Sequence, residues 1–109
     1  MEIEFATADI RALCEQERLM MKRFGKPGAK KLKSRLADLA AVAVVTELVA
    51  GRPHPLKGDR LGEFALDLQG ATRLVFKATN DPVPRTQDGA IDWGSVTKVR
   101  IIFIGDYHD

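Results

Sequence analysis

The chain opens with a strand-like alternation of side chains and then changes to helical spacing. Ile3 and Phe5 alternate with acidic residues, which predicts a short first strand. Thr7 or Asp9 follows at once, and either side chain can cap the start of a helix. The pattern therefore predicts a strand that leads directly into a helix.

The helical region falls into two parts. Glu17 interrupts the apolar stripe of the first helix, and Gly25, Pro27 and Gly28 predict a break after it. In the second helix, apolar residues recur every three or four positions: Ala29, Leu32, Leu36, Leu39 and Ala43. Such spacing predicts that one face of this helix packs on a core while its lysines face solvent.

Strand patterns return in the second half. Residues 52–60 are rich in proline and glycine and predict an ordered loop. Residues 63–68 and 73–78 alternate around a Gln69-Gly70 turn, which predicts an antiparallel hairpin with one buried face.

The last part of the chain combines a polar loop with an apolar strand. Residues 79–94 predict a long surface loop that Trp93 pins to the core. Residues 96–104 carry apolar side chains on both faces and predict an interior strand. The expected fold is α+β, with two N-terminal helices on one face of a small, mostly antiparallel sheet.

Length and composition narrow the class of protein. The 109 residues fit one domain over residues 1–109. Cys14 is the single cysteine, which excludes an internal disulfide and favours a reducing, cytoplasmic setting. The start of the chain lacks the pattern of a signal peptide, and the longest apolar run, residues 39–45, is too short to cross a bilayer. No membrane association is expected.

The formal charge is only +2, but the cations are unevenly distributed. Residues 22–35 contain no acid and carry the cations Lys22, Arg23, Lys26, Lys30, Lys31, Lys33 and Arg35. Such a surface suits phosphate backbones, although a solvated helix face explains it equally well. The sheet face away from the helices is expected to carry Arg73, Lys77, Lys98 and Arg100 around Val75 and Ile102. A face that is both cationic and apolar predicts an RNA platform.

The chain has two histidines, one in the loop before the hairpin and one near the C-terminus. His54 and His108 can share general acid–base work near neutral pH if they meet at one rim of the sheet. Lys57 and Arg73 can stabilise negative charge on phosphate. The set requires no metal or cofactor, and a metal site from the histidines and Asp106 lacks a spacing signature. In the alternative interpretation, the histidines lie in a surface loop and a frayed end, and Arg73 pairs with Asp67.

Four segments of the sequence resemble a known protein family. The likeness rests on the segments His54-Pro55-Leu56-Lys57-Gly58-Asp59-Arg60, Gly62-Glu63-Phe64-Ala65-Leu66-Asp67-Leu68, Thr72-Arg73-Leu74-Val75-Phe76 and Asp106-Tyr107-His108. Together they resemble the HigB-type branch of the RelE/ParE toxin superfamily over nearly the whole chain. The resemblance implies a ribosome-dependent endoribonuclease that cuts translated mRNA, and a cognate antitoxin, a HigA-like helix-turn-helix protein.

The resemblance also implies roles for individual residues. The acid–base candidates are His54 and His108, and Lys57 with Arg73 stabilises phosphate charge. Tyr107 stacks on a base, and Asp106 orients an imidazole. Two other functions stay open: a ParE-like toxin that inhibits DNA gyrase without RNA chemistry, and a catalytically silent interaction protein. The intact set of acid–base residues argues against both.

Overall fold

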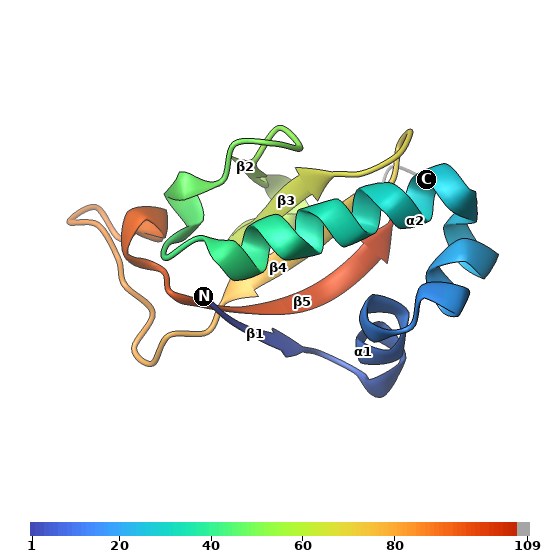
Figure 1. Cartoon of the computed structure of the whole chain (residues 1–109). Helices are drawn as coiled ribbons and strands as arrows, with labels where there is room; N and C mark the ends of the chain where they lie inside the picture. Colours follow the sequence, from blue (N-terminus) through green and yellow to red (C-terminus); the bar gives the residue numbers. More distant parts are fainter. Residues whose placement is uncertain (107–109) are drawn as a thin grey trace.

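Five strands form one mixed sheet in the computed structural model, which describes residues 1–106 (Figure 1). The strands are β1 (Glu2–Phe5), β2 (His54–Pro55), β3 (Glu63–Asp67), β4 (Arg73–Ala78) and β5 (Lys98–Gly105). Their order across the sheet is β1-β5-β4-β3-β2, with β1 parallel to β5 and the other pairs antiparallel. The hairpin and the interior position of β5 confirm the sequence predictions.

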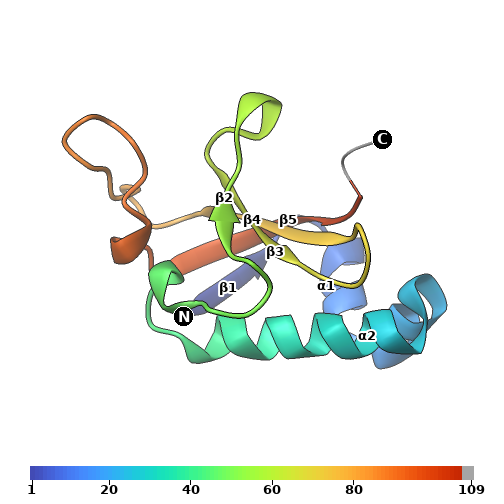
Figure 2. The same ribbon diagram turned by 90° about the horizontal axis from the view of Figure 1, so that it is seen from above.

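Two helices lie on one side of this sheet, as expected for the predicted α+β class (Figure 2). They are α1 (Ala8–Glu15) and α2 (Glu17–Ala41). Thr7 caps α1, because its Oγ accepts a hydrogen bond of 3.1 Å from the backbone N–H of Ile10. The prediction that the first helix runs on to the glycines is wrong, since Gln16 is extended and separates the two helices.

The expected break at residues 25–28 is a kink at a single residue. Gly25 has φ 73° and ψ 177°, a conformation that favours glycine, and the helix resumes immediately after it. Pro27 is tolerated because it lies in the first turn after the kink, where its missing N–H would have no helical partner. The bent helix α2 therefore combines the end of the first predicted helix with the second predicted helix.

The core lies between α2 and the sheet. Leu32 and Leu39 of α2 are completely buried against Leu66 and Phe76. The loop of residues 79–94 is held to this core by Trp93, as the sequence predicts, with its ring 4.8 Å from that of Phe64 and 6.2 Å from that of Phe76. Short 3₁₀ helices occupy Val45–Glu47, Gly58–Arg60 and Trp93–Ser95.

The hairpin is buried on both faces, which corrects the prediction of one buried face. On the side away from α2, Ala65 and Val75 are completely buried and Leu56 packs onto them from the loop after β2. A register shift between β4 and β5 makes the alternation of side chains irregular, so Ile102 and Phe103 both contact this second cluster. We call this side of the sheet the helix-free face. None of the helices within residues 1–106 is long and apolar enough to cross a membrane.

Candidate active site

The first candidate residue, His54, lies on the helix-free face. β2 pairs with β3 so that His54 stands opposite Ala65, whose side chain belongs to the cluster on that face. The Nδ1 atom of the half-buried ring lies 2.7 Å from the carbonyl oxygen of Arg52. A carbonyl can only accept, so this contact places the proton on Nδ1 and leaves Nε2 of the neutral ring with a free lone pair. Nε2 is thus the atom that can accept a proton from a ligand.

A carboxylate shared by two arginines lies next along β3. Arg73 Nε is 2.8 Å from Asp67 Oδ1, and Arg52 Nε donates to Asp67 Oδ2 at 2.9 Å. The Arg73 contact is an ion pair without a well-directed hydrogen bond. Arg73 also donates to the carbonyl oxygens of Gly70 and Thr72, at 3.4 and 3.2 Å. Its side chain is only 13% exposed, so it is held in place, whereas that of Arg52 is 64% exposed.

This arrangement joins the predicted histidine and arginine through Asp67 and through Arg52, to which the sequence analysis gave no role. Arg52 provides both the carbonyl that orients His54 and a guanidinium on Asp67, which in turn contacts Arg73. The alternative interpretation of Arg73 as the partner of Asp67 is therefore correct in its geometry. Within the described residues, two guanidinium groups therefore converge on one carboxylate at this rim of the sheet. We call the residues His54, Arg52, Asp67 and Arg73 the arginine rim.

The loop after β2 adds further charged groups over the helix-free face. Lys57 is exposed, and within residues 1–106 it has no ion pair. Arg60 lies over the ring of Phe103, 4.6 Å from its centroid, and its NH1 donates to Glu63 Oε1 at 2.8 Å. Sequence reasoning missed this stack, because simple alternation assigns Phe103 to the helix side and only the register shift turns it to this face.

The C-terminal candidates are placed only in part. Asp106 is exposed and follows the end of β5, where Gly105 pairs with Arg73. The chain thus leaves the sheet beside the arginine rim. Tyr107 and His108 lie outside the described residues.

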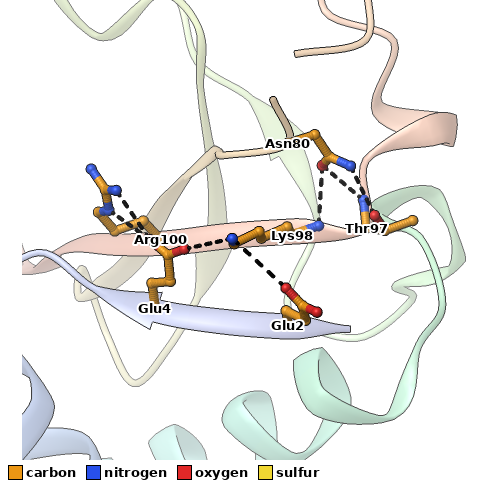
Figure 3. A network of polar contacts seen from close by, with 6 residues as sticks. All are labelled: Glu2, Glu4, Asn80, Thr97, Lys98 and Arg100. Carbon is orange, nitrogen blue, oxygen red and sulfur yellow. Dashed lines mark hydrogen bonds and ion pairs between the residues drawn. The ribbon is translucent and has the colours of Figure 1, made fainter. Parts of the chain in front are cut away.

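The far end of the helix-free face carries a second charged cluster, which corrects the expectation of a free cationic platform (Figure 3). Arg100 NH2 and Lys98 Nζ lie 3.0 and 3.1 Å from the two oxygens of Glu4, and Lys98 is also 3.9 Å from Glu2. Hydrogen bonds from Lys98 and then Arg100 hold the pKa of Glu4 below its ordinary value of 4.5. We call these residues the β1–β5 clamp. Of the cations predicted for the face, Lys77 alone is exposed with no ion pair inside residues 1–106.

The basic residues of α2 lie in the other layer of the molecule (Figure 2). They do not share a face with His54, which the sequence pattern alone leaves undecided. Two of them have acidic partners: Lys33 Nζ lies 2.9 Å from Glu17, and Arg35 Nε lies 3.1 Å from Asp38. The remaining cations on α2 lack ion pairs within the described part of the chain.

One cavity is separate from the arginine rim. It has a volume of about 660 Å³ and lies between the loop after β2 and the loop before β5, bounded by Leu61, Glu63 and Trp93. Residues 1–106 contain no group of three or more His, Cys, Asp or Glu side chains that could hold a metal ion.

Known proteins with a similar structure support this fold. No family model matches the chain, and no curated protein matches it either. Solved structures do match: a YoeB/ParE toxin from Agrobacterium tumefaciens is similar with a TM-score of 0.61 over 99% of this chain and 100% of the other. The chain has the fold of the YoeB and ParE toxins.

A second structure agrees with the first. A YoeB–YefM complex from Staphylococcus aureus is similar with a TM-score of 0.58 over 100% of this chain and 98% of the other. Identity is 16% in both cases, so the likeness concerns the fold. It confirms the predicted α+β, RelE-like architecture, and the HigB subtype stays a prediction.

Proposed function

We propose that this chain is the toxin of a toxin–antitoxin pair and cleaves translated mRNA on the ribosome without a metal ion. The observation that carries the proposal is the oriented His54 ring, whose Nε2 is free to accept a proton on the same sheet face as Arg73. The toxin fold of the similar structures supports it. The assignment to the HigB branch rests on the sequence segments that resemble it.

The proposed reaction is attack of a 2′-hydroxyl on the adjacent phosphate. His54 Nε2 accepts the proton as the bond from O2′ to phosphorus forms, and the bond from phosphorus to O5′ breaks. His108, the second acid–base candidate, donates a proton to the leaving oxygen in this proposal. The products are a 2′,3′-cyclic phosphate and a 5′-hydroxyl. Asp106 orients an imidazole and Tyr107 stacks on a base in the same proposal.

The cations near the rim stabilise the charge that develops on the phosphate. Arg73 is held in place by Asp67 and two carbonyls, so little reorganisation accompanies the reaction. Lys57 and Lys77 have no acidic partner within residues 1–106 and add mobile positive charge. Lys98 and Arg100 take no part in the proposal, since the β1–β5 clamp holds them.

A protein partner completes the proposal. The Staphylococcus aureus structure is a complex of YoeB with YefM, and this precedent supports a cognate antitoxin for the present chain. We propose a HigA-like helix-turn-helix protein in that role. Exposed Lys22 and Lys26 on α2 are proposed to contact ribosomal RNA phosphates.

Primer extension on cellular mRNA after brief expression tests the proposed function. Discrete cuts inside translated frames, lost in His54→Ala, are the expected result. DNA damage with intact mRNA would instead indicate a gyrase inhibitor of the ParE kind, and an absence of both effects would indicate a catalytically silent protein. Co-purification from a two-gene expression system tests for the antitoxin.

A further inference from the structure

The helical spacing divides the cations of α2 into two stripes. Positions three or four apart lie on one side of a helix. After the kink at Gly25, one stripe with its uncharged neighbours consists of Pro27, Lys30, Lys31, Ser34 and Arg35. The other contains Lys26 and Lys33, the last of which is bound to Glu17. The run of basic residues is therefore not one uniform surface.

The first stripe borders a groove beside the β3–β4 turn. Two cavities of about 300 and 230 Å³ lie between α2 and this turn, and Gln69 lines both of them. Basic side chains line them from the helix: Lys30, Lys31 and Arg35 in the larger, and Arg23 in the smaller. Among the described residues that line either cavity there is no carboxylate. Of the four basic residues, Arg35 is paired with Asp38, which leaves Arg23, Lys30 and Lys31 as the cations without an ion pair in the described part of the chain.

Polar groups that donate hydrogen bonds complete the lining. Ser34 and Gln69 line the larger cavity, and Gln69 and Thr72 line the smaller, so side chains that can donate hydrogen bonds border both. Clefts with one sign of charge concentrate counter-charged ligands, and phosphate oxygens accept from hydroxyl, amide and guanidinium groups alike.

The groove adjoins the arginine rim at the same end of the sheet. Gly51 packs closely on Arg35, since a Cβ built on Gly51 would lie 2.9 Å from Arg35 Cδ. The carbonyl of Gly51 also accepts a hydrogen bond from the N–H of Asp67, and Arg52 follows directly. On the other side of the turn, Arg73 donates to the Gly70 and Thr72 carbonyls. The β3–β4 turn thus lies between the groove and the proposed cleavage site.

We propose that the groove between α2 and the β3–β4 turn binds the phosphodiester backbone of single-stranded RNA that continues past the cleaved nucleotide. The inference rests on the proposed function and extends it, because it gives the RNA a path from the helix-free face around the hairpin end. Arg23, Lys30 and Lys31 contact phosphates on this path, whereas Arg35 stays bound to Asp38 and the bases face outward and are not read.

Equilibrium binding of 2′-O-methyl RNA, which cannot be cleaved by its own 2′-hydroxyl, tests the groove. Oligonucleotides of about 4 and about 12 nucleotides lie within the range that single-strand grooves cover. The longer RNA should bind the native chain more tightly. In Lys30→Gln/Lys31→Gln this advantage should disappear, and the slope of log K against log salt should become shallower by roughly 1.4, about 0.7 per lost phosphate contact.

The matched control is Arg18→Gln/Lys33→Gln, which removes the same charge from the same helix outside both cavities. It should keep the native length advantage and slope, and thermal unfolding should show that both double variants are folded. Equal losses in the two double variants would overturn the groove in favour of a general charge effect. Polyglutamate that competes with the longer RNA at equal affinity would overturn it in favour of a protein-binding site.

The groove and the proposed function can fail separately. If the native chain cuts mRNA and Lys30→Gln/Lys31→Gln retains the native length advantage, the groove inference is wrong and the cleavage proposal stands. If the native chain leaves mRNA intact but the groove variant loses the length advantage, the cleavage proposal is wrong and the groove stands.

Discussion

The two charged clusters on the helix-free face are built from the same residue types. They differ in the number of carboxylates that their cations contact. In the β1–β5 clamp, Lys98 and Arg100 meet the two carboxylates of Glu2 and Glu4, so the cluster is neutral (Figure 3). In the arginine rim, two guanidinium groups share the single carboxylate of Asp67.

This difference in the number of carboxylates separates the structural role of the clamp from the chemical role proposed for the rim. The clamp joins the edge strand β1 to β5 and leaves no excess charge for a ligand. In the proposed mechanism, the rim sets two guanidinium groups beside an oriented imidazole, a combination that stabilises an attacked phosphate. Counting cations along the sequence does not distinguish the two, because the deciding quantity is the number of carboxylates within reach.

The largest expected effect comes from removing the imidazole of the rim. His54→Ala should lower the rate of mRNA cleavage by about 10²–10⁴-fold, the usual loss when a positioned acid or base is removed. Single-turnover cleavage on purified ribosomes measures it. Arg100→Gln, which alters the clamp, is the control and should cleave at nearly the native rate. Similar losses in the two variants would remove the distinction between the clusters.

Replacing the fixed guanidinium of the rim should have the next largest effect. Arg73→Gln is expected to cost roughly 10²–10³-fold in cleavage rate, as for loss of a preorganised donor. Arg73→Lys should recover only part of this, because an ammonium cannot reproduce the guanidinium fork that contacts Asp67 and the turn carbonyls. Full recovery by lysine in the same assay would mean that charge alone matters there.

The apolar support of the rim can be weakened separately. Leu56 packs on Ala65 and Val75 just after His54, so it fixes the loop that also carries Lys57. Leu56→Ala should lower the free energy of unfolding by about 2 kcal/mol, the low end for a leucine truncation, because the side chain lies at the surface of a small cluster. Urea denaturation measures this loss. An unchanged midpoint would show that the loop does not depend on this contact.

The smallest expected effect is the loss of stability when the clamp is altered. Because the folded-state pKa of Glu4 is lowered, the ionised carboxylate stabilises the native state above its ordinary value of 4.5. That contribution is lost as the pH falls through the lower folded-state value. Glu4→Gln should therefore be slightly less stable than the native chain at pH 7, and the two should converge in acid. Urea titrations across this range compare them, and a gap that widens in acid would contradict the sign.

The sequence by itself determined the elements whose signals are local. The alternation around Gln69-Gly70 predicted the hairpin, and Trp93 predicted the anchor of the long loop. The cap of α1 was predicted at Thr7 or Asp9, and Thr7 makes it. Each depends on side-chain spacing or on hydrogen bonds between near neighbours. The resemblance to a toxin family also led to the fold that the solved structures support.

Only the tertiary structure decided which charges are free and which faces are shared. The register shift that turns Phe103 outward depends on how β5 meets β4. The sharing of Asp67 by Arg52 and Arg73 joins a loop to two strands, and the layers of the fold place α2 opposite His54. Charge balance at a site depends on distances in space, and a sequence pattern that is local along the chain does not contain them.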